Sequence, residues 1–267
     1  MSEIYEPHVI KSVHGYQKGK SPITNARAHI NKAAIIKIDL ANFFPGISGG
    51  MIHSALTSHP YHMQPRAATL ITALCTYRGI LPQGSPASPI ISNIVARSLD
   101  IKLINFAKKH RCTFTRYADD ITISFTNHHH ASRSIFYEEE NLRLSDELKD
   151  IFTSKNFVIN EDKLRFRKYY NRQMVNGIII NNKKLNLSRQ YVNEIKLLIH
   201  IYARYGKAAA ERSFSKKHKR NRYSADGKFD ILKTIRGKLE YLKYIKGYDD
   251  SVFLALARKF KVIDSEY

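Results

Sequence analysis

Residues 113–125 read Thr113-Phe114-Thr115-Arg116-Tyr117-Ala118-Asp119-Asp120-Ile121-Thr122-Ile123-Ser124-Phe125. On both sides of the central Ala118-Asp119-Asp120, β-branched and aromatic residues alternate with more polar ones. This period of two predicts two strands, and the Asp-Asp pair between them predicts the turn of a hairpin. Two carboxylates are therefore expected at a hairpin tip.

Two like charges a few ångströms apart raise each other's pKa and destabilise a site unless positive charge is supplied. A divalent cation bound at the tip would supply it. The alternative is a solvated turn, because Asp is a common turn residue for local hydrogen-bonding reasons. The choice between them depends on the rest of the chain.

Composition indicates a partner that is a polyanion. The 267 residues carry a formal net charge of +21 with a pI near 9.9, and 11% of them are aromatic. A folded, strongly basic protein with many aromatic residues is typical of nucleic-acid binding. A basic protein without catalytic activity is the alternative on composition alone.

Neither a membrane span nor a secretory signal is expected. No apolar run reaches the roughly 18 residues that a transmembrane helix needs, and residues 1–7 lack the basic-then-apolar pattern of a signal peptide. Cys75 and Cys112 lack the spacing of a zinc site and are too few for a disulfide framework, so both are expected to be buried. We therefore expect a cytoplasmic protein.

A third carboxylate follows an apolar run of strand length, Ile35-Ile36-Lys37-Ile38-Asp39-Leu40. Asp39 precedes Asp119 by 80 positions (119 − 39). If their strands pair in one sheet, Asp39, Asp119 and Asp120 converge on one patch, as two-metal phosphoryl transfer requires. Hard oxygen ligands favour Mg2+.

Several further elements are predicted from apolar spacing. The apolar spacing in residues 51–78 is compatible with a helix after the breaks at Pro60 and Pro65. A further helix follows the Pro-rich residues 81–89, with Ser85 or Ser88 as its cap. Residues 138–156 are predicted as one amphipathic helix that includes Leu142 and Leu144. Short strands are predicted at 157–160 and 177–180.

From residue 188 onward the pattern is helical and basic. The charge run between the helices, with Lys216, Lys217, Lys219 and Arg220, is either a solvated loop or a nucleic-acid contact. The histidines at 128–130 invite a metal-site interpretation, but consecutive residues cannot all face one ion. A solvated loop is the preferred interpretation there.

Together these motifs resemble reverse transcriptases. Residues 38–44, Ile-Asp-Leu-Ala-Asn-Phe-Phe, resemble the first acidic motif of the family. Residues 81–86, Leu-Pro-Gln-Gly-Ser-Pro, resemble its nucleotide-pocket motif, and residues 117–120, Tyr-Ala-Asp-Asp, its signature hairpin. Asn160 with Lys163 resembles the next motif. The resemblance covers roughly residues 10–250, with the motifs in the family's order.

Within the family, the bacterial retron enzymes fit best. Asn25-Ala26-Arg27-Ala28-His29 resembles their Asn-Ala-x-x-His element. Val175-Asn176-Gly177 resembles their Val-Thr-Gly triplet, with Asn176 in the threonine position.

The resemblance implies an α+β fold with right-hand polymerase architecture. Residues 1–34 would be a truncated fingers or retron-specific segment, residues 35–187 an antiparallel-sheet palm with embedded fingers helices, and residues 188–267 a helical basic thumb. Family members have several dozen residues of fingers before the region of His14. A short form, a misassigned start and one part of a split enzyme are all open, and the residues that grip the triphosphate are not identified.

The resemblance also implies roles. Asp39, Asp119 and Asp120 would be catalytic and, with Leu40, would bind Mg2+. Incoming deoxynucleoside triphosphates would contact Phe43, Phe44, Gln83, Gly84, Ala118 and Lys163. RNA would contact Asn25, His29, Val175, Asn176, Gly177 and the basic run at Lys216, Lys217, Lys219 and Arg220.

Some of these roles have structural alternatives. Lys163 is either a group that acts on the leaving pyrophosphate or a surface lysine, and Gln83 either a nucleotide contact or a turn residue. Phe44 is either a steric gate beneath the sugar or a core residue beside Phe43. Asn25 and His29 either contact RNA or make hydrogen bonds inside the fold.

The family's chemistry predicts template-directed DNA synthesis on RNA. For a retron enzyme the partners would be a structured non-coding RNA serving as template and primer, its DNA product, and an effector protein in antiphage defence. Two alternatives remain: a defence-associated or mobile-element reverse transcriptase without a retron RNA, and a non-catalytic RNA-binding subunit.

Overall fold

The hairpin predicted around Asp119 is present in the computed structural model, where it joins strands β2 (Cys112–Tyr117) and β3 (Asp120–Phe125). The structure describes residues 2–127, 135–138, 141–181, 183–218 and 230–264. These divide into two units, one of residues 1–176 with 180–183, and one of residues 177–179 with 184–267.

The first unit is built on a four-stranded antiparallel sheet in the order β2-β3-β1-β6. Strand β1 (Ala34–Asp39) pairs with β3 along its whole length, from Ala34 opposite Phe125 to Asp39 opposite Asp120. On its other edge β1 pairs with β6 (Arg165–Lys168). The predicted run 35–40 is thus a central strand.

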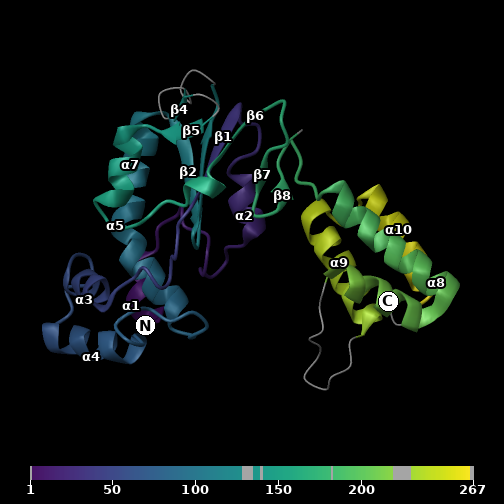
Figure 1. The fold of residues 1–267 in the computed structure, drawn as a ribbon, viewed down its shortest axis with the longest axis horizontal. Helices are drawn as coiled ribbons and strands as arrows, with labels where there is room; N and C mark the ends of the chain where they lie inside the picture. Colours follow the sequence, from purple (N-terminus) through teal and green to yellow (C-terminus); the bar gives the residue numbers. More distant parts are fainter. Residues whose placement is uncertain (1, 128–134, 139–140, 182, 219–229, 265–267) are drawn as a thin grey trace. The chain divides into compact units, whose positions relative to one another are not determined.

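Alternation in β3 separates an apolar face of this sheet from a polar one. Ile121, Ile123 and Phe125 belong to the main hydrophobic core, whereas the polar Thr122 and Ser124 are buried on the other face, where Ser124 contacts His29. Helices α5 (Ser88–Lys109) and α7 (Asp146–Thr153) lie on one side of the sheet, and α2 (Pro22–Arg27) lies on the other (Figure 1). The period of two in the sequence therefore reflects two different buried surfaces.

The remaining elements of the first unit precede α5 or flank the sheet. They include α1 (Ser2–Tyr5), the 3-10 turn η1 (Glu6–His8), α3 (Gly49–Thr57) and α4 (Pro65–Cys75). Helix α4 confirms the helix predicted after Pro60 and Pro65, and it begins at Pro65 itself. Helix α5 is also confirmed, but its N-cap is Ala87, without a side-chain cap, so the predicted cap at Ser85 or Ser88 is wrong.

The predicted helix over 138–156 is wrong in its first half. Residues Ile135–Glu138 and Asn141–Leu144 form the two-stranded sheet β4-β5, and α7 begins only at Asp146. Ser145 caps α7 by accepting a hydrogen bond from the Leu148 amide, and this cap ends the strand. The predicted strand at 157–160 is reduced to a bridge between Leu40 and Ile159. The turn η2 (Glu161–Lys163) follows it.

Strand β7 (Met174–Val175) belongs to the first unit, and β8 (Ile178–Ile179) belongs to the second. The rest of the second unit is helical: α8 (Arg189–His218), α9 (Ile231–Lys246) and α10 (Ser251–Lys261). Helix α8 is kinked at Gly206, where φ is 77°. Ile195, Ile235 and Phe260 are among the fully buried residues of its core.

The unit boundary near residue 184 lies close to the expected start of the thumb at 188, and the assignment of fingers, palm and thumb stays a prediction. Among the described helices, none is both long and apolar enough to cross a membrane.

Candidate active site

The register of the sheet brings the three predicted carboxylates to one end of it. Asp39 ends β1, Asp120 begins β3, and the two are direct partners across the antiparallel pair. Asp119 lies in the turn that precedes β3, and its carbonyl accepts a hydrogen bond of 3.1 Å from the Leu40 amide. The backbone that follows Asp39 is thus bonded to the hairpin tip.

The hairpin turn is tight. Tyr117 pairs with Asp120, so only Ala118 and Asp119 form the loop, and Ala118 has a φ of 57°. Positive φ at the first central residue is a feature of the turns that match the twist of paired strands. This turn displaces Asp119 from the ladder, so that it lies beside Asp39 and Asp120 without belonging to either strand.

Gly15 supports the turn from outside the sheet. A Cβ atom on Gly15 would lie 2.5 Å from the backbone nitrogen of Ala118, which is closer than any side chain tolerates. The carbonyl of Gly15 accepts a hydrogen bond of 3.0 Å from the buried side chain of Asn93. Glycine at position 15 therefore allows the chain to pass directly against the tip.

Arg116 fixes the same turn from within β2. Its guanidinium is fully buried and makes two hydrogen bonds of 2.7 Å to the carboxylate of Asp100 in α5. Its third bond, of 3.1 Å, goes to the carbonyl of Ala118. Since removing one partner of a buried ion pair costs about 3–5 kcal/mol, this pair is a strong constraint on the hairpin.

Polar groups surround the carboxylates of Asp39 and Asp120. Lys163 donates to Asp39 Oδ2 at 3.1 Å, and Asn160 donates to the same oxygen at 3.4 Å. Lys37 lies 4.0 Å from Asp120 Oδ1. The charge of Asp39 raises the pKa of Lys163, chiefly through their hydrogen bond, so Lys163 is a cation at neutral pH.

Asp119 is the carboxylate whose ionisation the site opposes. Burial raises the pKa of Asp119 above its usual range, and the charges of Asp120 and Asp39 raise it further. A backbone hydrogen bond and the charge of Lys163 act in the opposite direction. Negative charge gathered in a partly desolvated cleft is the electrostatic condition that a bound cation relieves.

Asp39 and Asp119 share a cleft of about 660 Å³, called here the acidic cleft, with Phe43, Phe44, Gln83 and Lys163. Asp120 does not line this cleft but borders a smaller cavity of about 240 Å³, which Asp39 and Lys163 also line. Four of the six predicted nucleotide-binding residues are therefore gathered around two of the three carboxylates. The other two do not line the acidic cleft: Ala118 is buried, and Gly84 is exposed with a φ of 89°.

The donor set fits a hard divalent cation. Carboxylate oxygens from two chain segments face one cleft, and Leu40, whose side chain is buried, could add only its main-chain carbonyl. In the described part of the chain, no three His, Cys, Asp or Glu residues are already arranged as a metal site. Lys163 forms an ion pair with Asp39, so its ammonium already places one positive charge at the cleft.

Phe43 and Phe44 differ in environment. Phe43 is 5% exposed and stacks on Phe157, with ring centroids 6.1 Å apart, so it is a core residue. Phe44 is half-buried at the edge of the core, with its ring centroid 6.3 Å from that of Tyr16. Phe44 therefore has the accessibility that a contact with a bound nucleotide requires.

The residues predicted to contact RNA are mostly bonded to each other or buried. His29 is fully buried between Ser124 and Thr115, whose hydroxyls lie 2.6 Å and 2.7 Å from its ring nitrogens. Burial, followed by the charges of Lys32 and His14, lowers the pKa of His29 to about 3. For His29 the structure has the internal hydrogen bonding that was the alternative to RNA contact.

Asn25 and Asn176 are hydrogen-bonded through their side chains, and Asn176 Nδ2 lies 3.5 Å from Asp120 Oδ2. Val175 is buried, and Gly177 has a φ of 79°. Lys216 is exposed in the last turn of α8, whereas Lys219, Arg220 and the histidines at 128–130 lie outside the described residues, as does the side chain of Lys217.

Sequence reasoning missed the supporting residues Gly15, Asp100 and Arg116. One signal was present: Arg116 interrupts the alternation immediately before the hairpin tip, and a charged residue at a buried strand position requires a partner. Nothing local identifies Asp100 as that partner.

Comparison with known proteins decides the family. The model described as "Reverse transcriptase (RNA-dependent DNA polymerase)" matches residues 1–202. The chain belongs to the reverse transcriptase family. The resemblance expected from residues 38–44, 81–86 and 117–120 is therefore confirmed.

Several curated retron reverse transcriptases are similar to this chain. It is 30% identical to the retron Ec86 reverse transcriptase of Escherichia coli over 186 residues, which are 70% of this chain and 54% of that protein. It is 29% identical to the retron Ec83 reverse transcriptase of the same species, over 72% of this chain and 62% of that protein. The chain thus spans about half to three fifths of the length of these two relatives.

Among solved structures, apo telomerase from Candida tropicalis is similar with a TM-score of 0.52 at 11% identity, over 96% of this chain and 48% of the other. Identity this low shows the fold alone. The fold of this chain is the α+β fold expected for a right-hand polymerase.

Proposed function

We propose that the protein is an RNA-directed DNA polymerase that adds deoxynucleotides to a primer on a structured RNA template. The observation that carries this proposal is the acidic cleft, in which Asp39 and Asp119 lie with Phe44, Gln83 and Lys163. Membership of the reverse transcriptase family supports it. The similarity to retron enzymes supports the finer proposal that the product is the RNA-linked DNA of a retron, made in antiphage defence with an effector protein.

In this proposal Asp39 and Asp119 would hold Mg2+ in the acidic cleft, with the carbonyl of Leu40, and Asp120 would add negative charge from the neighbouring strand. When bound, the divalent ions would activate the attacking hydroxyl and neutralise charge on the triphosphate. The ammonium of Lys163, now bonded to Asp39, stabilises the leaving pyrophosphate. In this proposal Gln83, Gly84 and Ala118 contact the incoming nucleotide, and Phe44 packs against its sugar.

The proposed fingers, palm and thumb are residues 1–34, 35–187 and 188–267. The exposed Lys216, together with Lys217, Lys219 and Arg220, contacts RNA phosphates in this proposal. A second group contributes to RNA recognition in this proposal by shaping the surface that RNA contacts. It consists of Asn25, His29 and Val175-Asn176-Gly177. A net charge of +21 is consistent with such a partner.

The test is primer extension on an RNA template with the four deoxynucleoside triphosphates and Mg2+. The Asp119→Asn variant is expected to lose extension while it retains RNA binding, because the change removes ligand charge and keeps shape. Asp162→Asn is the matched control: Asp162 lines the same cleft from η2 but is exposed, so this variant should extend primers normally. Equal extension by Asp119→Asn and the wild type would reject the site.

Two further measurements address the finer proposals. Mg2+ should raise the melting temperature of the wild type and not that of Asp119→Asn, because only the wild type gains binding energy in the folded state. Sequencing of the nucleic acid that copurifies with the protein should reveal covalently branched RNA–DNA. Unbranched DNA products would instead favour a reverse transcriptase without a retron RNA, and RNA binding without synthesis would favour a non-catalytic subunit.

A further inference from the structure

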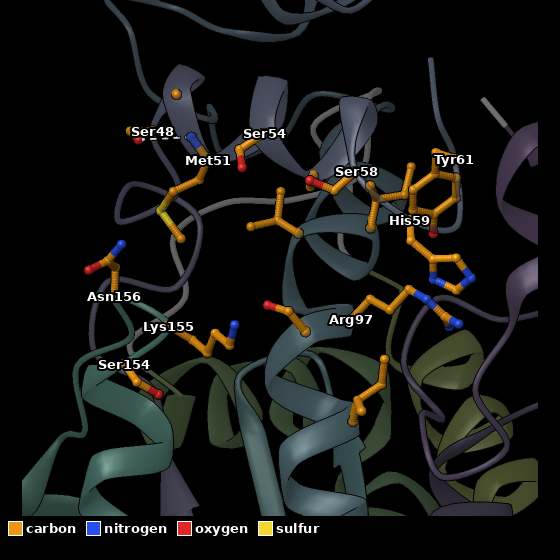
Figure 2. A pocket seen from close by; sticks show the side chains of 16 residues that line it. Ser48, Met51, Ser54, Ser58, His59, Tyr61, Arg97, Ser154, Lys155 and Asn156 are labelled. Carbon is orange, nitrogen blue, oxygen red and sulfur yellow. Dashed lines mark hydrogen bonds between the residues drawn. The ribbon is translucent and has the colours of Figure 1, made fainter.

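Two further cavities of the first unit do not border the carboxylates. One, of about 600 Å³, lies between α3, α5 and the turn after α7 (Figure 2). Two polar atoms of its lining residues, the hydroxyl of Tyr61 and the Nε of Arg97, have no hydrogen-bond partner among the described residues, but both are inaccessible to water and so offer nothing to a ligand. The other cavity, of about 530 Å³, lies where β1 begins and where β3 and β6 end. Its surroundings combine exposed aromatic rings with positive charge.

The turn after β6 presents two tyrosine rings to solvent. Tyr169 is 61% exposed and Tyr170 is 66% exposed. Their ring centroids are 5.4 Å apart, with the ring planes at 75° to each other. Single exposed apolar residues are ordinary, whereas adjacent tyrosines offer the large amphipathic surface that is enriched at interfaces. We call this pair, together with Lys32, Lys168 and Lys183, the tyrosine platform.

Hydrogen bonds fix the backbone of this turn. The side chain of Asn181 donates two bonds of 3.0 Å, to the carbonyls of Tyr169 and Asn171. Its carbonyl oxygen accepts a bond of 2.7 Å from the backbone amide of Gln173. The amide of Tyr169 donates to the carbonyl of Ala33 at 2.8 Å, which ties the turn to the start of the sheet. Since this backbone is already ordered, a ligand that binds here loses little affinity to ordering of the turn.

Positive charge surrounds the two rings. The ammonium of Lys168 lies 6.0 Å from the ring centroid of Tyr170, and Lys32 and Lys183 line the cavity with Tyr169. The three chain segments that meet here belong to long stretches of sequence without an acidic residue, which run between Glu6 and Asp39, between Asp120 and Glu138, and between Asp162 and Glu194. These stretches therefore supply no carboxylate that would neutralise the lysines, which favours a polyanionic partner.

The platform lies away from the proposed reaction. Lys168 pairs with Ala34 at the first residue of β1, whereas Asp39 is the last residue of that strand. Five residue steps along a strand span about 17 Å. The cavity of the platform shares no lining residue with the acidic cleft. Nucleic acid held at the platform would thus be a part of the strand that is not reacting.

We propose that the tyrosine platform binds unpaired nucleotides of an RNA strand, whose bases stack on Tyr169 and Tyr170 while Lys32, Lys168 and Lys183 contact its phosphates. Aromatic side chains beside a basic groove are how proteins hold single-stranded nucleic acid, because every base has a face on which a ring can stack. In a duplex the bases are already stacked on each other, so they are not available to a ring. The inference rests on RNA as the proposed partner, but not on the chemistry of the acidic cleft.

Tryptophan fluorescence provides a local test, because the chain contains no tryptophan. The change Tyr170→Trp therefore adds a single fluorophore, and it lies on the platform. The full-length variant, freed of nucleic acid and kept in EDTA, is titrated with a sixteen-nucleotide single-stranded RNA. Stacking of a base should quench the fluorescence until the site is saturated. The same RNA annealed to its complement should bind the site more weakly, by about fivefold or more.

Tyr248→Trp is the matched control. Tyr248 is 72% exposed and also lies near a lysine, with the Nζ of Lys243 5.1 Å from its ring centroid. That lysine is paired with Glu240 at 2.9 Å, and Asp249 follows Tyr248 in the chain, so carboxylates offset the positive charge there. The RNA should quench the fluorescence of this control little or not at all.

Two changes in the Tyr170→Trp background assign the binding to the platform. Tyr169→Ala should weaken it by about fivefold to a hundredfold, as expected for the loss of one stacked base. Lys183→Gln should reduce the slope of log K against log salt by about 0.7, as expected for one phosphate contact. Lys108→Gln removes an exposed charge of α5 outside the platform and should change neither quantity.

Three results would overturn the inference. They are the absence of quenching in Tyr170→Trp, equal quenching by single-stranded and duplex RNA, and equal quenching in Tyr170→Trp and Tyr248→Trp. If the wild type still extends primers in any of these cases, the proposed function stands and only the platform is rejected. A wild type that neither binds RNA nor extends primers would reject both.

Discussion

Asn25 in α2 and Asn176 after β7 are joined by a hydrogen bond between their side chains, although 151 positions separate them in the chain. Asn25 is 1% exposed and its side-chain carbonyl has no partner among the described residues, so its amide depends on Asn176. Asn176 in turn lies 3.5 Å from Asp120 Oδ2. Two elements outside the sheet are thus linked to one carboxylate of the site.

Asn176→Ala is expected to lower the free energy of unfolding by about 1–3 kcal/mol, because it leaves the buried amide of Asn25 unpaired. Urea denaturation measures this loss. In a double-mutant cycle, Asn25→Ala with Asn176→Ala should cost less than the sum of the single changes, by about 0.5–3 kcal/mol. Strict additivity would mean that the two side chains do not interact in solution.

Protonation of His29 should make the stability of the protein depend on pH. Burial lowers the pKa of His29 to about 3, below the value of about 6.5 in an unfolded chain. Between these values the unfolded chain binds more protons, so stability is lost as the pH falls from about 6.5 towards 3, by up to about 1.4 kcal/mol per pH unit. Urea denaturation of the wild type and His29→Gln from pH 7 to pH 5 should show a shallower slope in the variant. Parallel slopes would contradict the buried neutral state.

Gly15→Ala should disturb the hairpin tip, because its Cβ would lie 2.5 Å from the Ala118 backbone nitrogen. Forced overpacking of this kind costs about 1–3 kcal/mol, and displacement of the turn should reduce primer extension as well. Gly237→Ala is the matched control. Its Cβ would meet nothing within 4 Å in α9, so it should stabilise the protein by about 0.5–1 kcal/mol. Equal effects of the two changes would exclude a specific role for Gly15.

Phe44→Val should let the protein incorporate ribonucleotides far more readily, while its use of deoxynucleotides falls less. The reason is exclusion: a ring in contact with C2′ of the sugar leaves no volume for a hydroxyl. Single-nucleotide extension with each sugar measures this change. Phe43→Val is the comparison, since Phe43 is buried and should affect stability instead. A proportional fall in both activities of Phe44→Val would make Phe44 a core residue.

The fold around Asp119 was predictable because its determinants are local. Alternation at 113–125 and the apolar run at 35–40 each define a strand, and the Asp-Asp pair defines a turn. The strand at Leu142 and Leu144 was missed, although their spacing of two favours a strand and Ser145 is a good helix cap. The apolar residues after the cap, Leu148, Ile151 and Phe152, continue from Leu144 at helical spacing, so the two stretches resemble one amphipathic pattern.

The surroundings of the site were not predictable, because they depend on contacts between distant segments. Three contacts join parts of the chain that no local sequence pattern connects. They are those of Gly15 with Ala118, of Arg116 with Asp100, and of Asn25 with Asn176. The placement of Asp119 and Asp120 in different cavities, with Asp39 lining both, is likewise a property of the folded sheet.

The central position of β1 has a consequence for synthesis on the ribosome. Both neighbours of β1, the strands β3 and β6, lie C-terminal to it, at residues 120–125 and 165–168. A nascent chain that has emerged only as far as α5 therefore carries an apolar strand with two unpaired edges, a condition that favours aggregation. Asp39 acquires its partner carboxylates only when the hairpin has left the exit tunnel, so an incomplete chain cannot assemble this end of the sheet.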